Sequence, residues 1–227
     1  MRTRTLVAAL ALVCILTGTT VVLVVAIERA TGQESHDFLI WNLFLAWLPL
    51  VFALALEWRR RRGLGGVPAI LLGAAWLLFL PNAPYLVTDF VHLGRHSEGL
   101  WVWLDLATLT AGATAGALAG LLSLLLVQRT VSERLGPRFG WALVMVTLAL
   151  ASFGIYLGRV LRLNSWDLFA RPRLLAGELG ERLGDPLGDP RMIGGVIAVA
   201  VALGGAYLVF YRLAAALEAR GAQRQKV

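Results

Sequence analysis

The chain has 227 residues, of which 58% are hydrophobic and 15% are charged, and its formal net charge is +7. Soluble domains carry about 25% charged and about 45–50% apolar residues, so this composition excludes an ordinary soluble globular protein. Of the 21 basic residues all but Lys226 are arginines, and they flank apolar runs without forming a mixed basic and aromatic face. The charge therefore does not indicate nucleic-acid binding, and the single Cys14 excludes an internal disulfide.

Six apolar segments are each long enough to cross a bilayer, which takes about 20 helical residues. They lie near residues 5–27, 38–57, 67–87, 100–127, 140–160 and 191–212. The first follows Arg2 and Arg4 but is longer than the apolar part of a signal peptide, so we expect it to be retained. The sequence predicts an all-α membrane protein with one multi-pass domain over residues 1–227 and no soluble domain.

The orientation follows from the distribution of arginine and lysine between the two sides of these segments. Thirteen of the 21 basic residues fall on the side of the N-terminus and eight on the other side. Cytoplasmic loops are enriched in positive charge, so both termini are expected in the cytoplasm. The longest outer loop, residues 161–190, carries Leu175, Leu179 and Leu183 at helical spacing beside charged residues, which predicts an interfacial amphipathic helix.

The third segment is interrupted by "PNAPY", residues 81–85. Fourteen helical residues from Val67 to Leu80 span roughly 21 Å, so Pro81 falls inside the hydrocarbon core of about 30 Å, in its outer half. Pro81 and Pro84 both lack an N–H group and clash with the preceding turn. We therefore expect a break or kink at Pro81–Pro84 that faces protein or water, because lipid cannot satisfy the freed backbone groups.

The residues after this break suggest a polar site. Asn82 is expected to cap a restarted helix through the N–H of Tyr85, and the new helix start would favour an anion. On that helix Tyr85, Asp89 and His92 follow at i, i+4 and i+7 and share one face. The alternative is a proline kink whose Asp89 and His92 lie among lipid headgroups.

A second polar motif, "GRVLRLNSWDLF", ends the fifth segment on the same predicted face of the membrane. Arg159 is the natural partner of Asp89 or Asp105, because charges at this depth need pairing. Asn42 and His36 belong to the same layer. The candidate polar site consists of Asn82, Tyr85, Asp89, His92, Asp105, Arg159, Asn164, Trp166 and Asp167. The competing interpretation is a buried ion-pair layer that only joins helices.

Metal binding and covalent catalysis have little support in the sequence. Asp89 and His92 at i, i+3 are weak two-ligand candidates, to which Asp105, Asp167 or His36 would add a third. No metal-binding, P-loop or serine-hydrolase signature accompanies them, so no metal or cofactor is assigned.

Small residues line two of the predicted spans. Gly112, Gly116 and Gly120 follow one another at intervals of four, and Gly154 and Gly158 do the same in the fifth span. Such stripes let helix backbones approach closely in lipid. We interpret them as packing within the chain rather than as a dimer face.

The stretches "WLLFLPNAPYLVTDFVHL", residues 76–93, and "GRVLRLNSWDLF", residues 158–169, resemble the two signature regions of an uncharacterised bacterial membrane family, domain of unknown function 1361. The resemblance covers most of the chain and implies a multi-pass bacterial membrane protein. It implies no activity, cofactor or catalytic residue. The glycine- and arginine-rich loop after "NSWDLF" departs from the family pattern.

Three functional hypotheses remain open at this point. The first is an inner-membrane protein whose polar pocket at the extracytoplasmic interface binds or modifies a lipid or a lipid-linked anionic ligand. The second is a small transporter or channel, against which the inner halves of the spans look dry. The third is an accessory protein that packs against a membrane partner through its glycine stripes. The sequence indicates neither a cofactor nor an oligomeric state.

Overall fold

The computed structural model describes residues 3–32, 36–93, 99–160, 170–173, 176–177, 180 and 190–223. All regular structure in this part of the chain is helical, and six helices are long and apolar enough to cross a membrane. The chain is therefore a multi-pass helical membrane protein. The long helices are α1 (Thr3–Thr31), α2 (Asp37–Arg61), α3 (Val67–Phe79), α5 (Leu100–Leu135), α6 (Pro137–Val160) and α9 (Pro190–Gln223). The third span continues from α3 through α4 (Asn82–Tyr85) and the 3₁₀-helix η1 (Leu86–His92).

Each predicted apolar segment corresponds to one of these spans, and the structure extends most of them beyond the apolar run. The extensions carry charged or polar residues, such as the arginines of α2 and the stretch of α5 up to Leu135. Intrahelical ion pairs, such as that between Glu57 and Arg61, support helix beyond the apolar length. The amphipathic helix predicted around Leu175, Leu179 and Leu183 lies outside the described residues.

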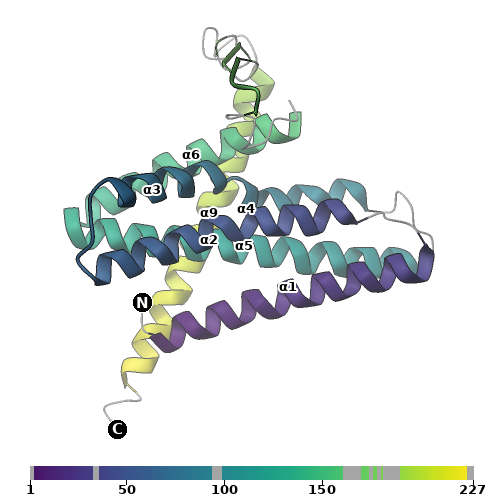
Figure 1. Cartoon of the computed structure of the whole chain (residues 1–227), viewed down its shortest axis with the longest axis horizontal. Helices are drawn as coiled ribbons and strands as arrows, with labels where there is room; N and C mark the ends of the chain where they lie inside the picture. Colours follow the sequence, from purple (N-terminus) through teal and green to yellow (C-terminus); the bar gives the residue numbers. More distant parts are fainter. Residues whose placement is uncertain are drawn as a thin grey trace.

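Helix α5 forms the centre of the bundle. In the apolar 18-residue stretch of α5, 67% of the residues are buried, against 6% in the corresponding stretch of α9. The other helices pack around it, with α1, α2, α6 and the kinked third span all in contact with it. Figure 1 shows α9 crossing the direction of the other long helices steeply, with α6 as its main neighbour. The buried core therefore lies along α5, whereas α9 exposes most of its apolar surface.

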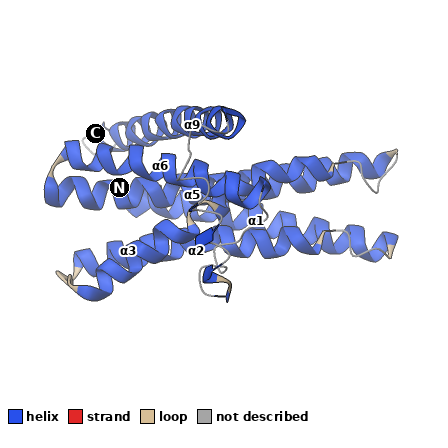
Figure 2. Cartoon of the chain, turned by 90° about the horizontal axis from the view of Figure 1, so that it is seen from above, coloured by secondary structure: helices blue, strands red, loops and turns tan. Residues whose placement is uncertain are grey.

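The bundle has two distinct ends. The start of α1, the end of α9, the α2–α3 turn and the α5–α6 turn lie toward one end of the long axis in both views (Figures 1 and 2). We name it the basic end, because it carries Arg59–Arg62, Arg134 and Arg138. The opposite end holds the end of α1, the start of α2, η1 and the start of α5. This arrangement agrees with six spans whose two termini lie on the same side.

The third span is kinked at its two prolines, as the sequence predicts, but its backbone never leaves the helical region. Leu80 has φ −56° and ψ −37°, and Pro81 has φ −58° and ψ −25°. The N–H of Ala83 donates to the carbonyl of Leu80 at 3.1 Å, and the N–H of Tyr85 donates to the carbonyl of Pro81 at 3.2 Å. The carbonyl of Leu80, which loses its usual partner to Pro84, is thus paired within the kink itself.

The predicted capping role of Asn82 is wrong. A capping residue leaves the helical region at the start of a helix, and the chain makes no such departure here. The side-chain Nδ2 of Asn82 instead donates backward to the carbonyl of Phe79 at 2.9 Å. Since α4 is only four residues long and continuous with the preceding turn, the expected anion-binding helix start is absent from this kink.

The register after the kink also differs from the prediction. Leu86–His92 is a 3₁₀-helix, in which about three residues make a turn and positions i and i+3 eclipse. Buried residues accordingly recur every third position, at Ala83 (0% exposed), Leu86 (1%) and Asp89 (1%). The predicted α-helical stripe of Tyr85, Asp89 and His92 is therefore wrong for Tyr85, which lies about a third of a turn from Asp89.

Glycines of the neighbouring helices lie closely against the kink. A Cβ added at Gly116 would lie 2.7 Å from the carbonyl oxygen of Ala83, and one at Gly120 would lie 2.9 Å from the Cβ of Ala83. On the α6 side, a Cβ at Gly154 would lie 2.7 Å from the ring of Pro81. The kinked segment is thus held between α5 and α6 at backbone distance.

The two remaining glycines of the predicted stripes are placed differently. A Cβ at Gly112 would meet the side chains of Leu39 and Thr20 at 3.3 Å, on α2 and α1. Gly158 is half-buried on α6. The stripe on α5 therefore faces three different segments of the same chain.

Candidate functional site

A buried carboxylate lies at the centre of the candidate site. Asp89 on η1 is 1% exposed, and its Oδ2 accepts a hydrogen bond of 3.1 Å from Nδ2 of Asn42 on α2. Its Oδ1 lies 3.6 Å from Nη1 of Arg159, near the end of α6. A buried carboxylate is costly unless it is hydrogen-bonded and paired, and here both partners come from other helices. The site therefore forms only when three spans are assembled.

Arg159 contacts the kinked span through hydrogen bonds and an aromatic ring, in addition to its ion pair with Asp89. Its Nη2 donates to the backbone carbonyl of Thr88, and its Nη1 donates to the hydroxyl of Tyr85 at 3.4 Å. The guanidinium carbon lies 5.6 Å from the centre of the Tyr85 ring, within the range of a cation–π interaction. The side chain stays 28% exposed. Arg159 therefore places a positive charge at the surface of the bundle, directly over the buried carboxylate.

The local sequence explains why these groups meet. The close approach of Gly154 to Pro81 brings α6 against the kink, and Arg159 follows five residues later on the same helix. On η1 the hydroxyl of Thr88 donates to the carbonyl of Tyr85 at 2.6 Å, a contact between positions i and i−3 that fits the 3₁₀ register. The 3₁₀ register in turn directs Asp89 toward the bundle interior. We name Asn42, Tyr85, Asp89 and Arg159 the polar cluster.

Asp105 belongs to a separate pair. Its Oδ1 lies 3.3 Å from Nε2 of His36, which follows the α1–α2 connection. Both residues are buried, and the backbone N–H of His36 reaches a carboxylate oxygen of Glu28 at 3.4 Å. The sequence suggested Asp89 or Asp105 as the partner of Arg159. In the structure Asp89 pairs with Arg159, and Asp105 pairs with His36.

The remaining predicted site residues are placed as follows. Asn82 lies on the kink with its amide directed to the Phe79 carbonyl. For His92 only the backbone is described, as the last residue of η1. Asn164, Trp166 and Asp167 lie outside the described residues. Within the described part of the chain, no three His, Cys, Asp or Glu residues are grouped so that they could hold a metal ion.

Two buried polar pairs were not anticipated from the sequence, and both lie in the half of the bundle nearer the basic end. The hydroxyl of Tyr207 on α9 donates to the amide oxygen of Gln128 on α5. The indole N–H of Trp76 donates to the hydroxyl of Ser123 at 3.2 Å. This half of the bundle, for which the sequence suggested a dry interior, thus contains two polar pairs between helices. The first of these pairs had a signal in the sequence, because Gln128 is a polar residue directly after an apolar run.

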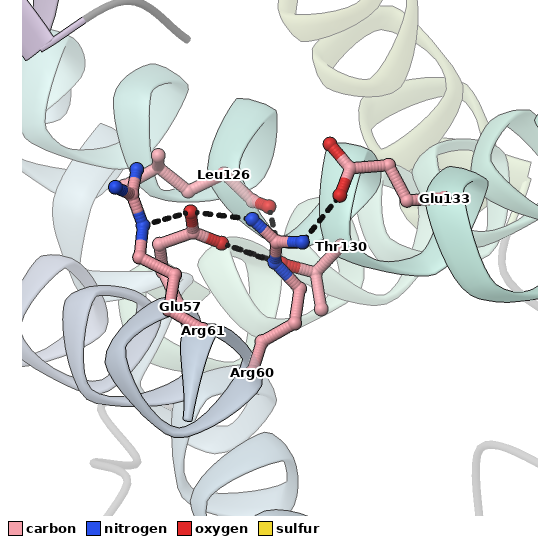
Figure 3. Close-up of polar contacts among 6 residues, drawn as sticks. All are labelled: Glu57, Arg60, Arg61, Leu126, Thr130 and Glu133. Carbon is pink, nitrogen blue, oxygen red and sulfur yellow. Dashed lines mark hydrogen bonds and ion pairs between the residues drawn. The ribbon is translucent and has the colours of Figure 1, made fainter. Parts of the chain in front are cut away.

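The basic end carries an ion-pair network, drawn in Figure 3. Glu57 accepts two hydrogen bonds from Arg60, at 2.7 and 2.8 Å, and one of 2.8 Å from Arg61. Arg60 also donates to Glu133 on α5, and the hydroxyl of Thr130 lies 3.4 Å from Glu57. A further pair of 2.7 Å joins Arg129 on α5 to Glu218 on α9. Three helices are thus joined at this end by matched charges.

The comparison with known protein families identifies the chain. The family model described as Protein of unknown function (DUF1361) matches residues 41–204. The chain belongs to this family. The DUF1361 match begins in α2 and ends in α9, so it contains the whole polar cluster and the kink, whereas α1 and His36 precede it. No curated protein and no solved structure matches the chain.

Proposed function

We propose that this DUF1361 protein lies in the bacterial inner membrane with its basic end in the cytoplasm, and that the polar cluster binds a phosphate-bearing lipid or lipid-linked ligand at the extracytoplasmic side. The excess of arginine at the basic end supports this orientation through the positive-inside rule. The polar cluster then faces the leaflet from which such a ligand would enter.

One observation carries the proposal: Arg159 is partly exposed while its carboxylate partner is enclosed. The guanidinium is held by Thr88, Tyr85 and Asp89, yet 28% of the side chain reaches the surface. A planar guanidinium presents several N–H donors in a fixed fork, which suits phosphate oxygens. An anionic headgroup would therefore meet a preorganised cation at the bundle surface.

Binding is favoured over chemical modification of the ligand. Among the described residues Asp89 is the carboxylate paired with Arg159, but it is 1% exposed and engaged by Asn42, so a ligand at the surface does not touch it. A general base must lie within hydrogen-bond reach of the proton that it removes. We assign Asp89 to holding Arg159 in place.

The test uses farnesyl phosphate as the probe and the purified chain in neutral detergent. Wild type is expected to bind the probe, measured by native mass spectrometry and by the shift of the unfolding temperature. Arg159→Lys keeps the positive charge beside Asp89 but removes the guanidinium fork, and it should weaken binding about tenfold, the effect of losing one charge-assisted hydrogen bond.

Arg29→Lys is the matched control, because Arg29 also lies at the opposite end and undergoes the same exchange of a guanidinium for an ammonium group. This variant should bind like wild type. Equal weakening in both variants would show that any arginine at this end supports binding, and unchanged binding in Arg159→Lys would reject the polar cluster as the site. Unfolding in the absence of probe establishes that each variant is folded.

A further inference from the structure

The four consecutive arginines at the end of α2 are not equivalent. Arg60 and Arg61 pair with Glu57, and Arg60 reaches Glu133 as well (Figure 3). Arg59 and Arg62 have no acidic partner among the residues that the structure describes. Two guanidinium charges therefore remain uncompensated at the turn between α2 and α3.

The turn holds these two arginines in defined positions. Nη2 of Arg59 donates to the carbonyl of Gly65 at 3.2 Å. Its Nε is shielded from solvent and finds no acceptor in the described part of the chain. The guanidinium carbon of Arg62 lies 4.2 Å from the centre of the Trp58 ring, and Trp58 is 48% exposed. Positive φ at Gly63 (+67°) closes the turn.

The surface next to this turn is apolar. Helix α3 begins directly after it and exposes Val67 (66%), Ile70 (71%) and Leu71 (63%). Tryptophan is enriched where a membrane protein crosses from headgroups to acyl chains, and Trp58 lies at the same end of the bundle as these aliphatic residues. The turn and the start of α3 thus combine cations, an interfacial aromatic ring and a lipid-facing surface.

We propose that the α2–α3 turn binds the phosphate of an anionic phospholipid through Arg59 and Arg62. The phosphate diester oxygens accept hydrogen bonds from the two guanidinium groups, and the acyl chains lie along the exposed face of α3. Anionic lipids attract each basic residue near the membrane surface. The site is independent of the polar cluster, which lies at the opposite end of the bundle.

The experiment compares phosphatidylglycerol with phosphatidylcholine, each titrated in mixed micelles with the purified full-length chain. Bound lipid is counted by native mass spectrometry. Wild type should retain phosphatidylglycerol preferentially. Arg62→Gln breaks none of the hydrogen bonds of the turn, and the loss of one charge at the membrane surface should weaken this binding about fivefold. The double variant, Arg59→Gln with Arg62→Gln, loses two such charges and should weaken it about 25-fold.

The matched control is Arg134→Gln with Arg138→Gln, on the other turn of the basic end. Both residues are exposed, and the pair changes the net charge as the first pair does. The control should stay within about twofold of wild type. Equal loss in the two pairs, no preference over phosphatidylcholine, or full competition by the same concentration of inorganic phosphate would each overturn the proposal. Arg62→Gln keeps the test decisive if the double variant at the α2–α3 turn fails to fold.

Discussion

The two ends of the bundle hold their charges in different ways. At the basic end Glu57 is bonded by Arg60 and Arg61, three and four residues further along the same helix, and the Arg61 side chain is 52% exposed. At the opposite end Asp89 is 1% exposed, and its partners Asn42 and Arg159 come from two other helices. The first arrangement is built mainly along one helix and reaches water through its arginines, whereas the second exists only in the folded bundle.

This difference has energetic consequences. An exposed ion pair contributes little because water and salt screen it, about 0–1 kcal/mol. A buried carboxylate that loses its cation remains desolvated without compensation, which costs about 3–5 kcal/mol. The two ends should therefore respond unequally to single substitutions of similar chemistry, and only the basic end should be sensitive to salt.

The largest effect is expected for Arg159→Met, which leaves Asp89 buried without a cation. The free energy of unfolding should fall by about 3 kcal/mol, measured by reversible unfolding in mixed micelles. Replacing Asp89 by Asn in the same chain removes the uncompensated charge and should recover about half of that loss. If the double variant is as unstable as the sum of the two single variants, the pair is not coupled and Arg159 acts through its contacts with Tyr85 and Thr88 alone.

The next effect concerns the packing that brings the polar cluster together. Gly116→Ala adds a Cβ that would lie 2.7 Å from the backbone oxygen of Ala83, which cannot move without displacing the kink. We expect a loss of about 2 kcal/mol, typical of overpacking. Gly112→Ala is the control, since its Cβ would meet only side chains at 3.3 Å and alanine favours helix by about 1 kcal/mol.

Gly112→Ala should therefore be close to neutral in the same unfolding measurement. A similar loss in both variants would mean that the kink is not held at backbone distance by Gly116. A loss confined to Gly116→Ala would show that α5 is held against the backbone of the proline kink at this position.

The sequence predicted the parts of this structure that depend on the length of the apolar segments and on the missing N–H groups of proline. Six apolar runs gave six spans, and the missing N–H groups of Pro81 and Pro84 gave the kink. It also placed the end of α6 on the same side as the kink, because alternating spans and the charge count fix which helix ends are neighbours.

The side-chain directions could not be predicted in the same way. The 3₁₀ register of η1 places Tyr85 about a third of a turn from Asp89, although both side chains reach Arg159. The backward hydrogen bond of Asn82 arises because the backbone stays helical through the kink. The kink is also packed against Gly116 and Gly154, which are distant in sequence. The pairing of His36 with Asp105 joins the start of α2 to α5, and no local sequence pattern indicates it.

The smallest effect is expected at the basic end. Glu57→Gln removes the charge that Arg60 and Arg61 share. It should lower the free energy of unfolding by about 1 kcal/mol at low salt, because these two partners are 25% and 52% exposed and water screens the pairs. Raising the salt from about 0.05 M to about 1 M screens the wild-type pairs, so the difference should shrink toward zero. The measurement is the same unfolding titration at both salt concentrations.

Glu133→Gln is the matched control, because Glu133 is 53% exposed and its single ion pair among the described residues is with Arg60. Its effect should be smaller than that of Glu57→Gln at either salt concentration. A loss for Glu57→Gln that persists at high salt would show that this network is shielded like the polar cluster, and the contrast between the two ends would fail. Arg159→Met supplies the complementary result, since the cost of a buried unpaired carboxylate should not change with salt.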